Sequence, residues 1–180
     1  MPRQRKKLLI VDGYNVLRSG SRYKLVSATH PDYTDDTFNT ARERLINDVV
    51  NYAGREWRAI IVFDGAYNEF SQGEVETVGG VQIMFSPAGQ SADKVIEKLA
   101  HDARERMIET LVVTSDATIQ DTVFGGGVDR MSAEGFSHEV GMYYTEARLD
   151  EAPKVARKNT VADRISPEAL AKLKALRDGR

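Results

Sequence analysis

The stretch LLIVD, residues 8–12, is a short apolar run that ends in an acid. A continuous run of this length is typical of a strand buried on both faces of a parallel sheet. Two later stretches have the same form: AIIVFD at residues 59–64 and TLVVTSD at residues 110–116. Because parallel strands end at a common edge of the sheet, we expect Asp12, Asp64 and Asp116 to share one cleft.

The segments between these runs have the spacing of helices and turns. A helix over residues 38–56 is expected after a long polar loop at residues 19–36, with Asp36 or Thr37 as its N-cap. A Gly-Gly pair separates two β-prone stretches, which predicts a hairpin. The later elements expected are strands at residues 75–78 and 81–85, helices at 92–106 and 118–124, a turn at 125–127 and a helix after Ser132.

This alternation predicts an α/β fold. Strands that alternate with helices give right-handed crossovers and a mostly parallel sheet between two helical layers. We therefore expect a three-layer α/β/α domain with about five strands. At 180 residues, the chain has room for one such domain over residues 1–147 and a basic linker and helix over residues 148–180.

The composition excludes several kinds of reactive site and indicates where in the cell the protein is expected. The chain has no cysteine, which excludes disulfides, thiolate zinc sites and cysteine nucleophiles. The net charge of −2 is uneven, because residues 148–180 contain nine Lys and Arg but five Asp and Glu, a net +4. The N-terminal apolar run is too short for a signal peptide or a membrane span. We expect a cytoplasmic protein that does not associate with membranes.

Crowded carboxylates point to a cation. Carboxylates repel one another unless a cation lies between them, and Mg²⁺ and Mn²⁺ prefer oxygen ligands. Asp93, in the first turn of a helix, is a third candidate ligand beside Asp12 and Asp116, and Glu97 follows it on the same face. Asp93 could instead complement the helix dipole, and Asp64 could be a turn residue before a glycine.

Other polar residues are candidates for supporting roles. Asn15 and Ser115 can orient ligands or a phosphate, but an Asn after a strand is often a turn residue and Ser115 can cap the next helix. Asp121 can complete the acidic site or face solvent. Basic residues are candidates for contacts to a nucleic-acid backbone, namely Lys94, Arg130, Lys172, Lys174 and Arg177.

Four blocks of sequence carry a family resemblance. LLIVDGYNVL, GVQIMFSPAGQSADKVIEKL, LVVTSDATIQDTVFGGG and RMSAEGF occur in that order. Together they resemble the YacP-like branch of the NYN domain family, which belongs to the PIN-like nucleases. The resemblance implies a PIN-like fold, endoribonuclease activity that leaves a 5′-phosphate, and a Mg²⁺ or Mn²⁺ site at Asp12, Asp93 and Asp116. One bacterial branch acts on messenger RNA in the ribosomal A site, which makes the ribosome a candidate partner.

Two rival functions are weighed against a nuclease. A haloacid-dehalogenase-like phosphatase also begins at a strand-end Asp, but it needs a second Asp two residues later, where this chain has Tyr14. A catalytically silent RNA- or ribosome-binding module with the same fold is the second rival. An RNA cleavage assay with Mg²⁺ or Mn²⁺ separates the enzyme from the module.

Overall fold

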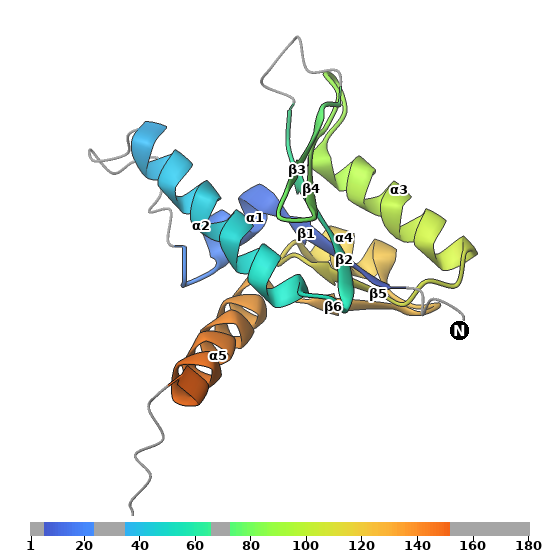
Figure 1. The fold of residues 1–180 in the computed structure, drawn as a ribbon. Coiled ribbons are helices and arrows are strands. Elements are labelled where there is room, and N and C mark those ends of the chain that lie inside the picture. The colour runs from blue at the N-terminus through green and yellow to red at the C-terminus, as the bar shows by residue number, and fades with distance from the viewer. Residues whose placement is uncertain (1–5, 24–34, 66–72, 152–180) are drawn as a thin grey trace, which may run out of the picture. The chain divides into compact units, whose positions relative to one another are not determined.

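The apolar run before Asp12 forms a central strand of the sheet (Figure 1). The computed structural model describes residues 6–23, 35–65 and 73–151. Within these ranges the strands are β1 (Lys7–Asp12), β2 (Trp57–Phe63), β3 (Val75–Val78), β4 (Val81–Phe85), β5 (Thr110–Val113) and β6 (Val128–Met131). The helices are α1 (Gly13–Ser19), α2 (Asp35–Ala53), α3 (Ala92–Glu105), α4 (Ala117–Val123) and α5 (Ala133–Glu151).

The sheet is mostly parallel, with strand order β3-β4-β2-β1-β5-β6. Only the β3–β4 hairpin pair is antiparallel among these neighbours. From β1 the chain builds outward through β2 to β4, and it then returns to the opposite side of β1 for β5 and β6. The strand order thus reverses between β1 and β5, and in open sheets of this kind ligands bind at the carboxyl ends of the strands at such a point.

Two apolar cores cover the two faces of the sheet. Leu9 and Val11 of β1 pack with α1, α2 and α5, whereas Leu8 and Ile10 pack with α3 and α4. Neighbouring residues of a strand point to opposite faces, so a strand buried on both sides must be apolar throughout. The three-layer α/β/α prediction is confirmed (Figure 1).

Three local predictions need correction. Strand β6 was not expected, because it lies at the sheet edge and its Asp129 and Arg130 are exposed, which removes the apolar run. Helix α1 was not expected either, since its seven residues are too few to show a helical period. Helix α2 starts at Asp35, so neither Asp36 nor Thr37 is its N-cap. The hairpin and the glycine turn at residues 125–127 are confirmed.

The contacts within the chain divide it into residues 1–146 and residues 147–180. The expected basic linker and C-terminal helix fall almost wholly outside the described residues, so that part of the prediction stays untested. None of the described helices combines the length and the apolar character that crossing a bilayer requires.

Candidate functional site

Asp12 closes β1 and is nearly buried, with 6% of its surface exposed. The hydroxyl of the fully buried Thr114 donates a 2.9 Å hydrogen bond to Asp12 Oδ2. The same hydroxyl accepts a 3.1 Å bond from the backbone N–H of Asp116. Thr114 therefore couples the end of β1 to the turn that carries Asp116.

A glycine lets the chain turn tightly after Asp12. A Cβ atom on Gly13 would lie 2.4 Å from Cε1 of Phe63, closer than any side chain tolerates. Phe63 is the last residue of β2, next to β1 in the sheet. Glycine at this position allows α1 to start directly against β2, which keeps Asp12 at the edge of the sheet.

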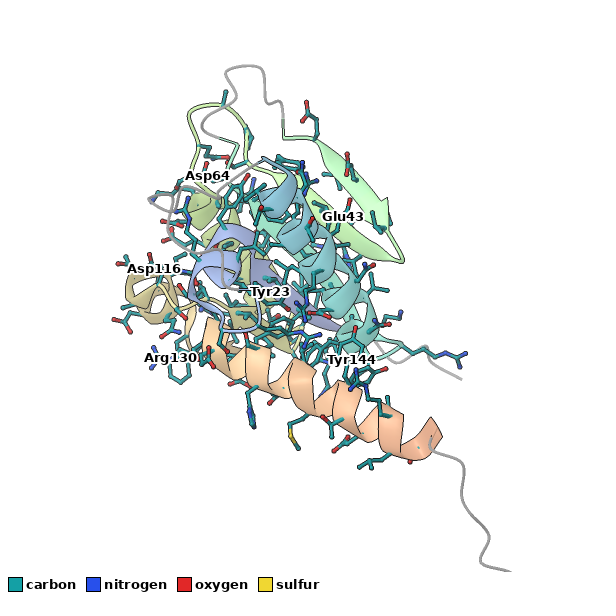
Figure 2. The ribbon with its side chains drawn as sticks, turned by 90° about the vertical axis from the view of Figure 1, so that its left-hand side faces the viewer. Tyr23, Glu43, Asp64, Asp116, Arg130 and Tyr144 are labelled. Carbon is teal, nitrogen blue, oxygen red and sulfur yellow. The ribbon has the colours of Figure 1, made fainter. Side chains whose placement is uncertain are left out.

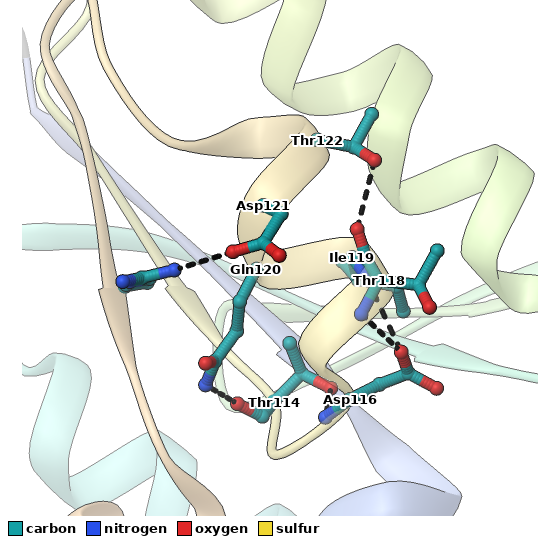
Figure 3. A network of polar contacts seen from close by, with 8 residues as sticks. Thr114, Asp116, Thr118, Ile119, Gln120, Asp121 and Thr122 are labelled. Carbon is teal, nitrogen blue, oxygen red and sulfur yellow. Dashed lines mark hydrogen bonds and ion pairs between the residues drawn. The ribbon is translucent and has the colours of Figure 1, made fainter.

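Asp116 is the N-cap of α4. Its Oδ1 accepts bonds from the backbone N–H groups of Thr118, at 2.8 Å, and Ile119, at 3.4 Å (Figure 3). Ser115 does not cap this helix, which was the alternative considered for its role. Ser115 Oγ instead accepts a 2.9 Å bond from the N–H of Ala133, the first residue of α5.

Asn15 also binds this turn. Its side-chain Oδ1 accepts a 2.7 Å hydrogen bond from the backbone N–H of Ser115. A residue of α1 thus fixes the β5–α4 turn from across the sheet edge. These contacts of Asn15 and Ser115 are to protein groups, and their expected role in orienting a ligand or a phosphate stays a prediction.

Asp93 lies in the first turn of α3, behind the N-cap Ser91. Partial burial raises the pKa of Asp93, and the carboxylates of Asp116, Asp64 and Glu97 raise it further. Burial likewise raises the pKa of Asp12 to about 6; the Thr114 hydrogen bond opposes this, and the Asp93 and Asp116 carboxylates add to it. Asp93 and Asp116 thus act electrostatically on Asp12, and Asp116 acts on Asp93, at this edge of the sheet.

Asp64 follows β2 at the same edge and is held by a residue that the sequence analysis missed. The fully buried Ser86 donates from Oγ to Asp64 Oδ1 at 3.3 Å and accepts a 2.9 Å bond from the N–H of Gly65. Ser86 comes directly after β4, so a search for any polar residue at a strand end, and not only for acids, would have found it. Figure 2 shows Asp64 and Asp116 along one side of the molecule.

Several predicted residues form ion pairs with one another. Asp121 is exposed and its Oδ1 lies 3.1 Å from Nη1 of Arg130. Lys94 Nζ lies 3.6 Å from Glu97 Oε2, one turn along α3. The other basic residues predicted to contact RNA, Lys172, Lys174 and Arg177, lie outside the described residues.

Comparison with known proteins places this site in a family. The model of the YacP-like NYN domain matches residues 9–178. The chain belongs to the YacP-like NYN domain family. The protein YacP of Bacillus subtilis strain 168, described as uncharacterized, is 31% identical over 133 residues, which are 74% of each chain.

Solved structures of this NYN family share the fold. The crystal structure of Rae1 (YacP) from Bacillus subtilis has a TM-score of 0.63 at 28% identity, over 96% of this chain and 95% of that one. A mutant of the same protein has a TM-score of 0.64 at 29% identity, over 86% of each chain. The NYN domain described above therefore has a PIN-like, nuclease-type fold.

The donor set of this NYN domain suits a hard cation. The converging side chains offer carboxylate oxygens, which Mg²⁺ and Mn²⁺ prefer. Within residues 6–23, 35–65 and 73–151, no three His, Asp or Glu side chains lie close enough to bind one ion together. Magnesium usually keeps several waters and takes one or two carboxylates directly. The acidic edge, defined as the carboxylates of Asp12, Asp64, Asp93 and Asp116 at the carboxyl end of the sheet, is compatible with that mode of binding.

Proposed function

We propose that this protein is a metal-dependent endoribonuclease in which Asp12, Asp93 and Asp116 bind Mg²⁺ or Mn²⁺, one or two of them directly and the rest through bound water. One observation carries the proposal: at the carboxyl edge of the sheet, the Asp93 and Asp116 carboxylates add to the rise in the pKa of the buried Asp12, and Asp116 adds to the rise in the pKa of Asp93. Such uncompensated charge is costly in an unliganded protein, and a cation would remove the cost. The nuclease-type fold of the family supports the same reading.

Each residue has a part in the proposed hydrolysis. A bound cation would neutralise charge on the phosphate and make a water more acidic. Asp12, fixed by Thr114, would present a carboxylate oxygen, and Asp116 would do so beside its capping role. Asn15 and Ser115 would hold the turn in place, while Asp64 and Glu97 would add negative charge around the cation. Water would attack phosphorus and lose a proton, the bond from phosphorus to the 3′-oxygen would break, and the 3′-oxygen would take up a proton. The products would carry a 5′-phosphate and a 3′-hydroxyl.

Basic residues would bring the RNA backbone to the acidic edge. Each Lys or Arg that neutralises a phosphate adds affinity that depends on salt and not on sequence. Lys94 and Arg130 are proposed for this role on the described domain, and the C-terminal residues Lys172, Lys174 and Arg177 remain predictions. We further propose that the substrate is messenger RNA, cleaved on the ribosome in the cytoplasm.

A cleavage assay tests the proposal directly. A fluorescent RNA should be cut in millimolar Mn²⁺ or Mg²⁺, and EDTA should stop the reaction. Asp12→Asn, Asp93→Asn and Asp116→Asn should each lower the rate at least about 100-fold, which corresponds to roughly 3 kcal/mol of transition-state stabilisation. Asp102→Asn is the matched control, because Asp102 is exposed on α3, more than two turns beyond Asp93. Full activity in an acidic-site variant would remove that residue from the metal set.

A second function is favoured by one observation. No metal-binding group of three side chains is found among the described residues, which would also fit a silent RNA-binding module. In that case the protein would bind RNA in the same assay, and no added metal would produce cleavage.

A further inference from the structure

An exposed aromatic–arginine pair lies beside the far end of α4. Phe124 follows the helix and is 59% exposed, and the guanidinium carbon of Arg130 lies 5.0 Å from the centroid of its ring. The glycine turn at residues 125–127 separates the two in sequence, and all three glycines have positive φ. This backbone shape, which side chains disfavour, brings the start of β6 back beside α4.

The pair is connected to the acidic edge through α4. Asp116 caps the first turn of the helix, and Phe124 comes after its last turn. Seven helical residues span about 10 Å. The side chain of Gln120 donates to the backbone oxygen of Thr114, which fixes α4 to the turn that carries Asp116 (Figure 3). An RNA strand at the proposed site would thus need only a few nucleotides to reach Phe124.

Arg130 forms an exposed ion pair with Asp121 that another anion could replace. Its ion pair with Asp121 is exposed, with 40% of the Arg130 side chain and 80% of the Asp121 side chain accessible. Exposed ion pairs contribute little, so a phosphate can replace Asp121 at low cost. A guanidinium also offers a flat face on which a base can stack.

We propose that Phe124 and Arg130 form a platform for an unpaired nucleotide of single-stranded RNA. A base stacks on the ring or on the guanidinium, and the adjoining phosphate accepts hydrogen bonds from Arg130. Duplex RNA fits less well, because its base faces are stacked inside the helix. This inference rests on the proposed function, in that RNA is the substrate of the acidic edge.

Binding of a labelled single-stranded RNA to the full chain tests the platform. Fluorescence anisotropy is measured with oligouridylate in the cleavage-deficient Asp12→Asn background. Phe124→Leu keeps the apolar volume but removes the ring, and it should raise Kd at least about fivefold. Phe124→Trp should retain wild-type Kd. Tyr143→Leu is the matched control, because Tyr143 is another exposed aromatic residue, on α5, and it should leave Kd unchanged.

Two charge variants test the role of Arg130. Arg130→Gln should weaken binding and lower the slope of log Kd against log salt by about one. Asp121→Asn should strengthen binding, because it removes both a competitor for Arg130 and a negative charge. A duplex of equal length should bind with the same Kd to Phe124→Leu as to the unsubstituted chain.

The outcomes distinguish this platform from the nuclease proposal. Weaker binding by Phe124→Leu in a protein that never cleaves RNA would support the platform and refute the nuclease. Metal-dependent cleavage together with an unchanged Kd in Phe124→Leu would support the nuclease and refute the platform. Failure of the full chain to bind single-stranded RNA would overturn the platform as well.

Discussion

Two buried aspartates of this protein have opposite surroundings. Asp48, on α2, is 2% exposed and faces a counter-ion: Arg22 donates from Nε at 2.7 Å and from Nη2 at 3.2 Å. The hydroxyl of Tyr23 donates a third bond, at 2.9 Å. Asp12 is 6% exposed, and its side-chain donor is the neutral hydroxyl of Thr114.

The charges near Asp12 are of its own sign. Among the described residues, no ion pair involves Asp12, Asp93 or Asp116. A buried acid with a bidentate arginine is explained by structure alone, because the pair satisfies itself. A buried acid that faces other acids lowers stability, and the proposed cation would remove that cost. Under the proposed function, the contrast separates a structural acid, Asp48, from a metal-binding acid, Asp12.

The largest expected effect of this contrast is on stability. Asp48→Asn should lower the free energy of unfolding by about 3 kcal/mol, because it leaves the charge of Arg22 without a partner. The matched change Asp12→Asn should not lower it at pH 7, since it relieves repulsion and keeps an acceptor for Thr114. Urea unfolding of both variants measures the difference. Equal losses in the two would mean that Asp12 is also a structural acid.

In metal-free buffer, the dependence of stability on pH should show that the Asp12 carboxylate is destabilising. The pKa of Asp12 is about 6 in the folded protein and near 4 in the unfolded chain, so the folded state binds more protons between these values. Stability should therefore fall as pH rises from 4 to 6, by up to about 3 kcal/mol from this group. In Asp12→Asn this part of the loss should vanish. Urea midpoints at pH 4, 5, 6 and 7 with EDTA give the test, and parallel curves would contradict it.

Added metal should offset the loss of stability that the buried Asp12 carboxylate causes. A ligand that binds only the folded state at ten times its Kd raises the free energy of unfolding by about 1.4 kcal/mol. Millimolar Mg²⁺ or Mn²⁺ should thus raise the melting temperature of the wild type and of Asp48→Asn, but not that of Asp12→Asn. Calorimetry with and without metal measures this, and an equal rise in all three proteins would place the cation elsewhere.

The sequence predicts the position of the acidic edge better than its internal contacts. Three apolar runs that end in acids are enough to place Asp12, Asp64 and Asp116 at one edge, because strand burial follows directly from composition. The hydrogen bond between Thr114 and Asp12 depends on the register of β1 against β5, which lie about a hundred residues apart. Local spacing carries no information about that register.

The structural acid was missed for a related reason. Asp48 lies on α2, where an acid is ordinarily exposed, and its partners Arg22 and Tyr23 lie in a stretch that was expected to be a polar loop. Their pairing depends on how that stretch returns to α2, which sequence periodicity does not show. The edge strand β6 was not predicted, because only Val128 of its four residues is fully buried. Half-exposed edge strands lack the apolar run that identifies a central one.

The smallest expected effect concerns the hydroxyls of Tyr23 and Thr114, each of which donates to a buried aspartate. Tyr23→Phe and Thr114→Val each remove one donor to a buried carboxylate, and each should cost about 1 kcal/mol of stability. Their consequences for function should differ. Asp48 keeps both bonds from Arg22, so Tyr23→Phe should leave RNA cleavage unchanged. Asp12 loses its side-chain donor in Thr114→Val, and the Asp116 N–H loses its acceptor, so the rate should fall about tenfold. Thr114→Ser, which keeps the hydroxyl, should restore most of that rate. Cleavage by Thr114→Val at the wild-type rate would show that Thr114 stabilises the turn without positioning Asp12.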